Sequence, residues 1–179
     1  MAAAFINPFV EGLEYSQPIP FMFAHYVLFI AGLIVGAVYL NMNRWFVIPG
    51  VILAFYWHLP VPFALSASEL GFRILEESSF VLAGLMVGGS LARVGWKIKG
   101  TMLGLWVIAD NALSVIFIVA PQLYSSSGLP LSPYTDSQFP LLGVTMILLM
   151  NSLVAVLIFV YTSRLTNELK RKREETQAN

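Results

Sequence analysis

Long apolar runs separated by short polar stretches dominate the pattern of this 179-residue chain. Each run is close to the ~20 residues that a helix needs to cross about 30 Å of hydrocarbon. The runs are too long, and alternate too little between apolar and polar positions, to be strands of a membrane barrel. A helix also satisfies its own backbone hydrogen bonds where lipid offers no partner. We therefore predict an all-α, polytopic transmembrane helical bundle with about five spans, at about residues 20–40, 46–62, 72–91, 101–121 and 139–161.

The second predicted span is the shortest, and it carries Pro49 near its start and Pro60 and Pro62 near its end. Proline has no amide hydrogen and clashes with the preceding helical turn, so a proline inside a helix kinks it. We expect Pro60 to bend this span and to turn His58 toward the inside of the bundle.

Glycines spaced four residues apart predict where the spans pack against one another. Such pairs allow two helix backbones to approach closely in a membrane. They indicate packing and carry no information about function. The pairs are Gly32 with Gly36, Gly84 with Gly88, and Gly100 with Gly104.

The composition agrees with a membrane protein, because 58% of the residues are hydrophobic, 11% are charged, and the mean hydropathy is +0.76. A soluble domain has roughly 25% charged residues. The absence of cysteine from the sequence excludes disulfides, thiolate metal sites and a cysteine nucleophile. Ten basic residues balance ten acidic ones, so the charge gives no indication of a nucleic-acid partner.

Basic residues are concentrated on one side of the predicted bundle. Only Arg73 falls on the other side, and the remaining nine are Arg44, Arg93, Lys97, Lys99, Arg164, Lys170, Arg171, Lys172 and Arg173. The positive-inside rule therefore puts the C-terminus in the cytoplasm and the N-terminus outside. We expect a multi-pass plasma-membrane protein with an external segment on the membrane surface (1–19), the bundle (20–163) and a charged cytoplasmic tail (164–179).

Ionisable side chains inside the apolar runs are the candidates for function, because each costs several kcal/mol there unless it is paired, hydrated or bound to a cation. They are His25, His58, Glu76, Glu77 and Asp110. The first four lie four or five residues from the outer ends of their spans, and Asp136 lies just outside the last span. These residues therefore share one layer beneath the outer surface. Asp110 and Asn151 lie instead near the middle of the fourth and fifth spans.

Structural roles explain the same residues without any ligand. His25 can hydrogen-bond a neighbouring carbonyl, and His58 can have a structural role in the kink caused by Pro60. Asp110 and Asn151 can form an interhelical hydrogen bond at mid-depth, which we expect to hold the fourth and fifth spans together. An ion-pair network with i,i+3 and i,i+4 spacing can be formed at the start of the third span by Glu69, Arg73, Glu76 and Glu77.

Metal binding is the functional alternative. Imidazole suits copper, zinc, iron and nickel, and carboxylates shift a site toward harder divalent ions. We predict a divalent transition metal, copper in preference to zinc, held by His25, His58 and at least one of Glu76 and Glu77. No span carries a pair of axial histidines, so we expect no haem. The chain has no serine–histidine–acid set, phosphate loop or HExxH motif, so we expect metal capture and transfer and no enzyme activity.

A family resemblance rests on several short elements between about residues 20 and 160. The most specific is Trp57-His58-Leu59-Pro60. The other elements are 75–80, 83–85 and 131–133, then Asp136, Gln138 and Gly143, with Met22 and His25 in an earlier helix. In this order the elements resemble the core, the last external loop and the final helix of the cytochrome c oxidase assembly factor (CtaG-like) membrane family.

The resemblance implies a role in delivering or handling copper while a haem-copper oxidase matures, outside the cytoplasm. The chain departs from the family pattern at Glu77 and Phe21, where family members have histidines. Family members usually have seven spans, so two N-terminal helices have no counterpart here. The resemblance therefore implies a shortened, divergent member.

Two other functions remain open. The chain can be a small structural or accessory subunit of a respiratory or other copper enzyme complex, with other integral membrane proteins as partners. It can also be a transporter or channel, for which Asp110 is the one suggestive residue. The lipid bilayer is the common partner in all three cases, and none of them involves nucleic acid.

Overall fold

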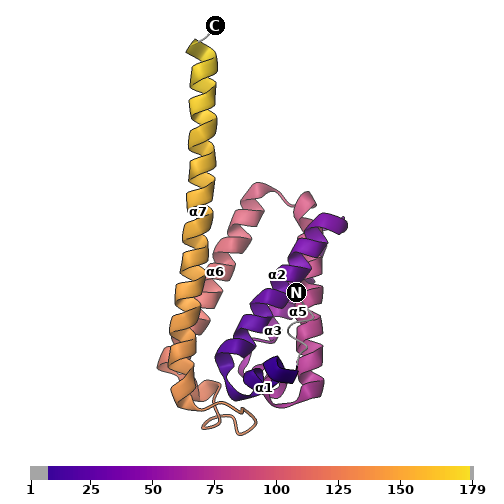
Figure 1. The fold of residues 1–179 in the computed structure, drawn as a ribbon. Coiled ribbons are helices and arrows are strands. Elements are labelled where there is room, and N and C mark those ends of the chain that lie inside the picture. Colours follow the sequence, from indigo (N-terminus) through magenta and orange to yellow (C-terminus); the bar gives the residue numbers. More distant parts are fainter. Residues whose placement is uncertain (1–7, 178–179) are drawn as a thin grey trace.

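The computed structural model describes residues 8–177, and this range contains helices but no β-strand (Figure 1). The predicted all-α class is therefore confirmed for the described part of the chain. The α-helices are α1 (Pro8–Ser16), α2 (Pro18–Tyr39), α3 (Val47–Tyr56), α4 (Pro60–Ser68), α5 (Leu70–Ser90), α6 (Trp96–Val119) and α7 (Phe139–Gln177). Short 3-10 turns lie at Arg44–Phe46, Leu91–Arg93, Pro121–Leu123 and Asp136–Gln138.

Several segments have the length and apolar character of membrane spans. Four qualify singly: Pro18–Tyr39, Leu70–Arg93, Trp96–Val119 and Asp136–Glu168. The segments Arg44–Tyr56 and Pro60–Ser68 qualify only together, and they are bent by 70° at the break between them. The described part of the chain thus has four helices that are long and apolar enough to cross a membrane, or five such segments if the bent pair is one span, as in a helical membrane protein. The orientation of the bundle stays a prediction.

The bend between α3 and α4 follows from Pro60, which has no amide hydrogen to continue the helix. The amide of His58 bonds to the carbonyl of Phe55 at 3.0 Å, and the amide of Leu59 bonds to the carbonyl of Tyr56 at 3.1 Å. These bonds close a tight turn and end α3. The expected kink is confirmed, but it divides the second predicted span into two separate helices.

Helices α2 and α5 cross with their backbones in direct contact, as the two glycine pairs predicted. A Cβ atom at Gly84 would meet the carbonyl oxygen of Phe29, and one at Gly32 would meet that of Val81. Gly36 and Gly88 face the opposite backbone in the same way. The third pair was predicted wrongly, because no other helix within the described residues comes within 4 Å of a Cβ placed at Gly100 or Gly104.

Aromatic rings close the end of the bundle where α1, α4 and the 120–138 segment meet. Phe63 of α4 is fully buried there, with its ring centroid 5.2 Å from Phe21 of α2 and 5.4 Å from Tyr124. Phe117 and Phe139 extend the cluster to α6 and α7. Such edge and tilted ring contacts contribute beyond the area that they bury. They fix the end of the bundle next to the candidate site.

Helix α1 was expected to lie on the membrane surface, and this location stays a prediction. The helix folds against the bundle (Figure 1), and its Glu14 side chain is completely buried. The hydroxyl of Tyr134 donates to the backbone carbonyl of Glu14, and the Gln138 side chain donates to the carbonyl of Ser16 at 2.9 Å. A buried arginine on α5, described below, explains why acidic α1 docks here. Residues 1–7 of the predicted segment lie outside the described residues.

Helix α7 runs from Phe139 to Gln177 without interruption, through the boundary predicted near residue 163. Its 39 residues correspond to about 58 Å at 1.5 Å per residue, more than a bilayer core of about 30 Å requires. Figure 1 shows its C-terminal half extending beyond the other helices. The cytoplasmic location of the charged tail stays a prediction.

Candidate functional site

His25, His58 and Glu76 come together, as their shared depth predicted. Nε2 of His25 lies 3.0 Å from Oε1 of Glu76, and both side chains are almost fully buried. The imidazole centroids of His25 and His58 are 6.0 Å apart, with an angle of 82° between the ring planes. The site thus combines a side chain from α2, one from α5 and one from the turn between α3 and α4.

His58 has both a structural role and an inward orientation. Its Nδ1 lies 2.8 Å from the carbonyl of Ala54, one helical turn earlier. Its own carbonyl accepts a hydrogen bond of 2.8 Å from the hydroxyl of Tyr124. The two explanations considered for this residue are therefore compatible, because the turn before Pro60 holds the backbone while the ring faces His25.

Aromatic neighbours hold the two imidazoles in a largely apolar environment. The ring of His25 stacks on Phe80, with centroids 4.5 Å apart and planes 16° apart. Phe21 meets His25 edge-on at 4.5 Å, and His58 meets Phe80 edge-on at 5.6 Å. These contacts fix the ring orientations. They also strengthen polar interactions at the histidine nitrogens, because few water dipoles are nearby.

The oxygen partners of the histidines indicate which ring nitrogens carry hydrogen. A carbonyl beside Nδ1 of His58 requires the proton on that nitrogen, which leaves a lone pair on Nε2. A carboxylate beside Nε2 of His25 favours the proton there and leaves the lone pair on Nδ1. Neither ring nitrogen of His25 has a hydrogen-bond partner among the described residues, so the carboxylate of Glu76 acts on Nε2 through its proximity and charge. The pair therefore offers two acceptor nitrogens to a Lewis acid or to a hydrogen-bond donor.

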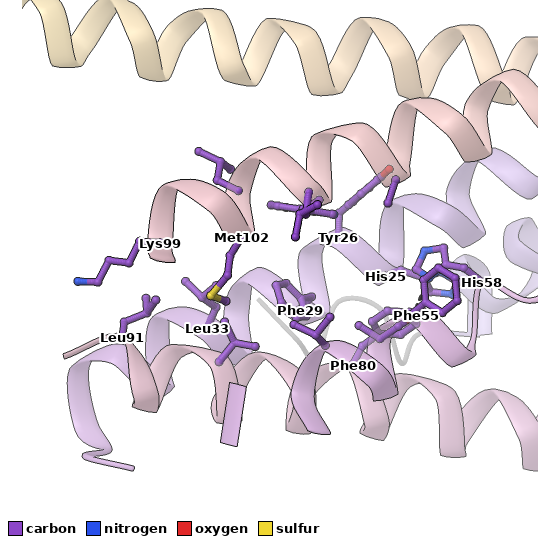
Figure 2. Close-up of a pocket in the computed structure, with 17 residues that line it drawn as sticks. His25, Tyr26, Phe29, Leu33, Phe55, His58, Phe80, Leu91, Lys99 and Met102 are labelled. Carbon is purple, nitrogen blue, oxygen red and sulfur yellow. Dashed lines mark hydrogen bonds between the residues drawn. The ribbon is translucent and has the colours of Figure 1, made fainter. Parts of the chain in front are cut away.

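The two histidines line one end of a cavity of about 560 Å³ between α2, α3, α5 and α6. Its walls are mostly apolar and include Phe29, Leu33 and Trp106. Figure 2 shows His25 and His58 together at one end and Lys99 at the other. Pockets of this size with a few convergent polar groups are typical ligand sites.

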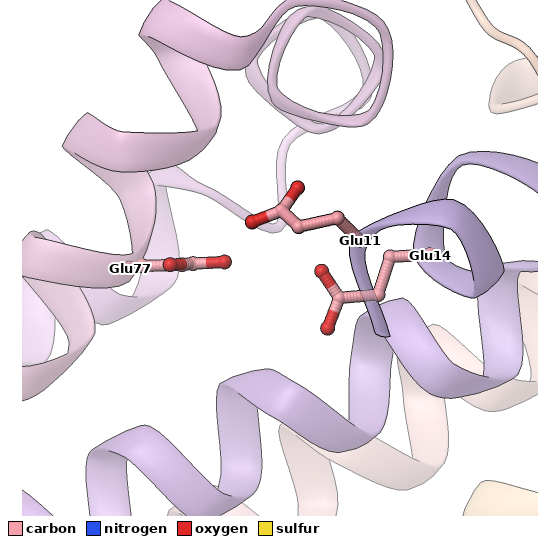
Figure 3. Close-up of side chains that lie close together, drawn as sticks. All are labelled: Glu11, Glu14 and Glu77. Carbon is pink, nitrogen blue, oxygen red and sulfur yellow. The ribbon is translucent and has the colours of Figure 1, made fainter. Parts of the chain in front are cut away.

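Glu77 does not join the histidines, although the sequence placed it in the same layer. Neighbouring residues on a helix point about 100° apart, so Glu76 faces α2 while Glu77 faces α1. Figure 3 shows the Glu77 carboxylate directed toward Glu11 and Glu14 of α1. One oxygen from each of these three residues lies within 4.8 Å of the others. The expected ligand pair of Glu76 and Glu77 is thus divided between two separate groups.

Arg73 lies at the centre of a buried charge cluster whose partners differ from those expected from the sequence. It is fully buried, and its Nη1 lies 3.1 Å from Oε2 of Glu11 and 3.7 Å from Oε2 of Glu14. Its other nitrogens donate to the carbonyls of Ser66 at 3.2 Å and Ala67 at 2.8 Å. We expected it to pair along α5 with Glu69, Glu76 and Glu77, but its ion-pair partners come from α1. The sequence did contain one indication of this pairing. Glu11 and Glu14 have no basic neighbour within 8–16, so their cation had to come from elsewhere in the chain.

Tyr15 and Glu14 complete the surroundings of this arginine. The guanidinium of Arg73 lies 3.8 Å from the ring centroid of Tyr15, a cation–π contact. Burial raises the pKa of Glu14 to about 8, although the positive charge of Arg73 acts in the opposite direction. The docking of α1 therefore depends on a buried charge cluster.

The expected pair between Asp110 and Asn151 is wrong. Asp110 accepts a hydrogen bond from the hydroxyl of Tyr26 on α2, whereas the amide of Asn151 donates to Oδ1 of Asn111 at 3.0 Å. Helices α6 and α7 are thus joined at mid-depth by two asparagines. Asp110 and Asn111 are adjacent and face different helices, so the depth of a residue alone could not select the partner.

Asp136 organises the loop that precedes α7 and lies away from the histidines. Its carboxylate accepts hydrogen bonds from Ser125 and, at 2.7 Å, from Ser127. The side chain is exposed. The prediction that it belongs to the buried polar layer is therefore wrong, because it begins the short turn Asp136–Gln138 outside the packed helices.

Comparison with known proteins identifies a family without an assigned role. No curated protein and no solved structure matches the chain significantly. A family model described as "Protein of unknown function (DUF1404)" matches residues 1–164. Because this match covers most of the 179 residues, the chain belongs to the DUF1404 family.

Proposed function

We propose that this protein captures a transition-metal ion, copper in preference to zinc, at His25 and His58 and passes it on without catalytic turnover. The observation that carries the proposal is the convergence of two imidazoles, a buried one at His25 and a partly buried one at His58, each with one nitrogen beside an oxygen and the other left with a lone pair. Metal-ligating histidines are usually oriented in this way by a carbonyl or a carboxylate.

The spacing of the rings agrees with shared coordination of one ion. A metal–nitrogen bond of about 2.0–2.1 Å puts an imidazole centroid roughly 3 Å from the ion. Two such rings on nearly opposite sides are then roughly 6 Å apart, and the observed separation is 6.0 Å. A wide angle between the two nitrogen ligands leaves other coordination positions of the metal open, and transfer of the ion to another protein requires such open positions. Glu76 then acts by orienting His25.

Copper is the first choice among the metals. Imidazole ligands suit both copper and zinc. The resemblance to CtaG-like assembly factors supports copper and makes a haem-copper oxidase the proposed client. A metal bound by two neutral imidazoles also relieves their unsatisfied lone pairs in an apolar environment, where such groups are costly.

Metal analysis tests the proposal directly. The protein, purified in mild detergent and loaded with Cu(II), should retain about one ion per chain and give an electron paramagnetic resonance spectrum with nitrogen coupling. His25→Gln and His58→Gln should each abolish retention, and Glu77→Gln serves as the matched control on α5. Equal copper retention by the wild type and the double variant His25→Gln/His58→Gln would contradict the proposal. A stoichiometric membrane-protein partner would favour the accessory-subunit alternative.

A second candidate function is suggested by the cavity of about 560 Å³. Two acceptor nitrogens at the end of an apolar cavity also suit a lipid-soluble molecule with a hydroxyl-bearing head and a long tail directed toward Lys99. A brominated long-chain alcohol should then quench the fluorescence of Trp106, which lines the cavity, and Trp106→Phe is the control. Loss of this quenching in the His25→Gln/His58→Gln variant would place the head of the alcohol at the same histidines.

A further inference from the structure

Three glutamates from two helices form a second cluster apart from the histidines. Glu11 and Glu14 come from α1 and Glu77 comes from α5 (Figure 3). One carboxylate oxygen from each lies within 4.8 Å of the other two. Charges so close repel one another strongly unless a positive group lies between them.

The positive charge of Arg73 balances only part of this cluster. Arg73 contacts Oε2 of Glu11 at 3.1 Å and Oε2 of Glu14 at 3.7 Å. Three carboxylates and one guanidinium leave a net charge of about −2 when all are ionised. A divalent cation has the charge that neutralises this remainder.

Glu14 provides an independent indication of a ligand. Its side chain is completely buried, and neither carboxylate oxygen accepts a hydrogen bond from any residue within 8–177. In Figure 3 its carboxylate points into the space between Glu11 and Glu77. A buried carboxylate without hydrogen bonds is costly, and cation coordination is one of the arrangements that compensate for it.

We propose that Glu11, Glu14 and Glu77 bind one hard divalent cation of the calcium class, which fastens α1 to α5. Calcium–oxygen bonds of 2.3–2.6 Å allow two ligands of one ion to lie up to about 5 Å apart. The three oxygens lie within 4.8 Å of one another, inside this limit. Magnesium dehydrates reluctantly and is usually bound through only one or two carboxylates with several waters, so a set of three protein carboxylates suits calcium better. The all-oxygen ligands separate this site chemically from the histidine site.

The ion can enter from one side of the cluster. Glu11 is 20% exposed, and Glu77 is partly exposed, whereas Glu14 closes the inner side. Water molecules can therefore fill the outer coordination positions, as they commonly do around calcium.

Calorimetric titration of the detergent-purified protein with calcium chloride, after removal of metals by a chelator, tests the site. We expect one saturable site per chain and a melting temperature that rises with calcium concentration. Glu77→Gln should weaken binding by about tenfold or more, since the charge of the ligands tunes calcium affinity. Glu69→Gln, an exposed acid at the start of α5, should bind as the wild type does. Absence of saturable binding to the wild type, or equal binding by Glu77→Gln, would overturn the proposal.

A second measurement reports directly on whether the ion fastens α1 to the bundle. Gly12 is exposed, and apart from its own helix backbone and chain neighbours no atom of residues 8–177 lies within 4 Å of a Cβ placed there, so Gly12→Cys accepts a spin label in a chain that otherwise lacks cysteine. Calcium should reduce the mobility of this label, and the effect should be lost with Glu77→Gln in the same chain. A label that calcium leaves unchanged would contradict the fastening of α1. A circular dichroism spectrum equal to that of the wild type shows that Glu77→Gln is folded, whatever the outcome at the histidine site.

Discussion

Nε2 of His25 on α2 lies 3.0 Å from Oε1 of Glu76 on α5. The backbones of these two helices touch at a glycine seam formed by Gly32, Gly36, Gly84 and Gly88. The seam brings the helices close enough for a short imidazole and a carboxylate to reach each other. It also fixes which face of α5 turns toward α2. The candidate metal site therefore depends on packing several turns away from the ligands.

The adjacent residues Glu76 and Glu77 give a matched pair of variants for the histidine site. Glu76→Gln should lower copper affinity by about 10- to 100-fold, because the carboxylate that orients His25 is lost. Glu77→Gln should leave copper affinity unchanged, since its side chain faces α1. Copper titration of the two purified variants measures the difference. Equal losses in both would contradict the role assigned to Glu76.

Replacement of Arg73 should strongly destabilise the protein. Arg73→Met leaves the buried carboxylate of Glu14 without its cation, and breaking a buried ion pair in this way typically costs about 3–5 kcal/mol. Thermal unfolding in detergent measures the loss. The double variant Arg73→Met/Glu14→Gln should recover part of it, because the uncompensated charge is then gone. A double variant no more stable than Arg73→Met alone would argue against the charge explanation.

A methyl group on the glycine seam should disturb the contact between α2 and α5. In Gly84→Ala the new Cβ meets the carbonyl oxygen of Phe29, which cannot move without shifting the helix. We expect a loss of about 1–3 kcal/mol, as for other overpacked positions. Gly104→Ala is the control, because nothing lies within 4 Å of its Cβ. Unfolding temperatures of the two variants provide the comparison, and equal values would exclude a tight seam.

The two asparagines between α6 and α7 should contribute measurably to stability. Asn111→Leu removes the acceptor of the 3.0 Å bond from Asn151. Polar contacts between membrane helices contribute about 0.6–2 kcal/mol. Asn111→Leu/Asn151→Leu should restore some stability, because no amide is then left without its interhelical partner. If Asn111→Leu unfolds at the wild-type temperature, the contact does not stabilise the helix pair.

Cysteine labelling tests the predicted orientation. The chain has no cysteine, so Ser126→Cys and Ser163→Cys each introduce a single reactive position. A membrane-impermeant thiol reagent should label position 126 in intact cells and position 163 only after permeabilisation, because basic residues favour the cytoplasmic side. The reverse pattern would invert the topology.

The sequence alone predicted the features that depend on local physical chemistry. Apolar runs of membrane length predicted the helices, Pro60 predicted a kink near the end of the second span, and the glycine spacing predicted the contact faces of α2 and α5, although not that these two helices meet each other. Counting residues from the ends of the spans placed His25 and His58 at one depth. Each of these inferences needs only the rise of a helix, the missing amide of proline or the cost of polar groups in lipid.

Tertiary packing decided which side chain of an adjacent pair meets which partner. Glu76 faces His25 while Glu77 faces α1, and Asn111 meets Asn151 while Asp110 meets Tyr26. Neighbouring residues share a depth but point about 100° apart, and the rotation of each helix is set by its contacts with the others. Arg73 shows the same limit across a longer separation, because its partners on α1 lie about 60 residues earlier in the chain. The contacts that fix the rotation of each helix and the docking of α1 exist only once the chain has folded.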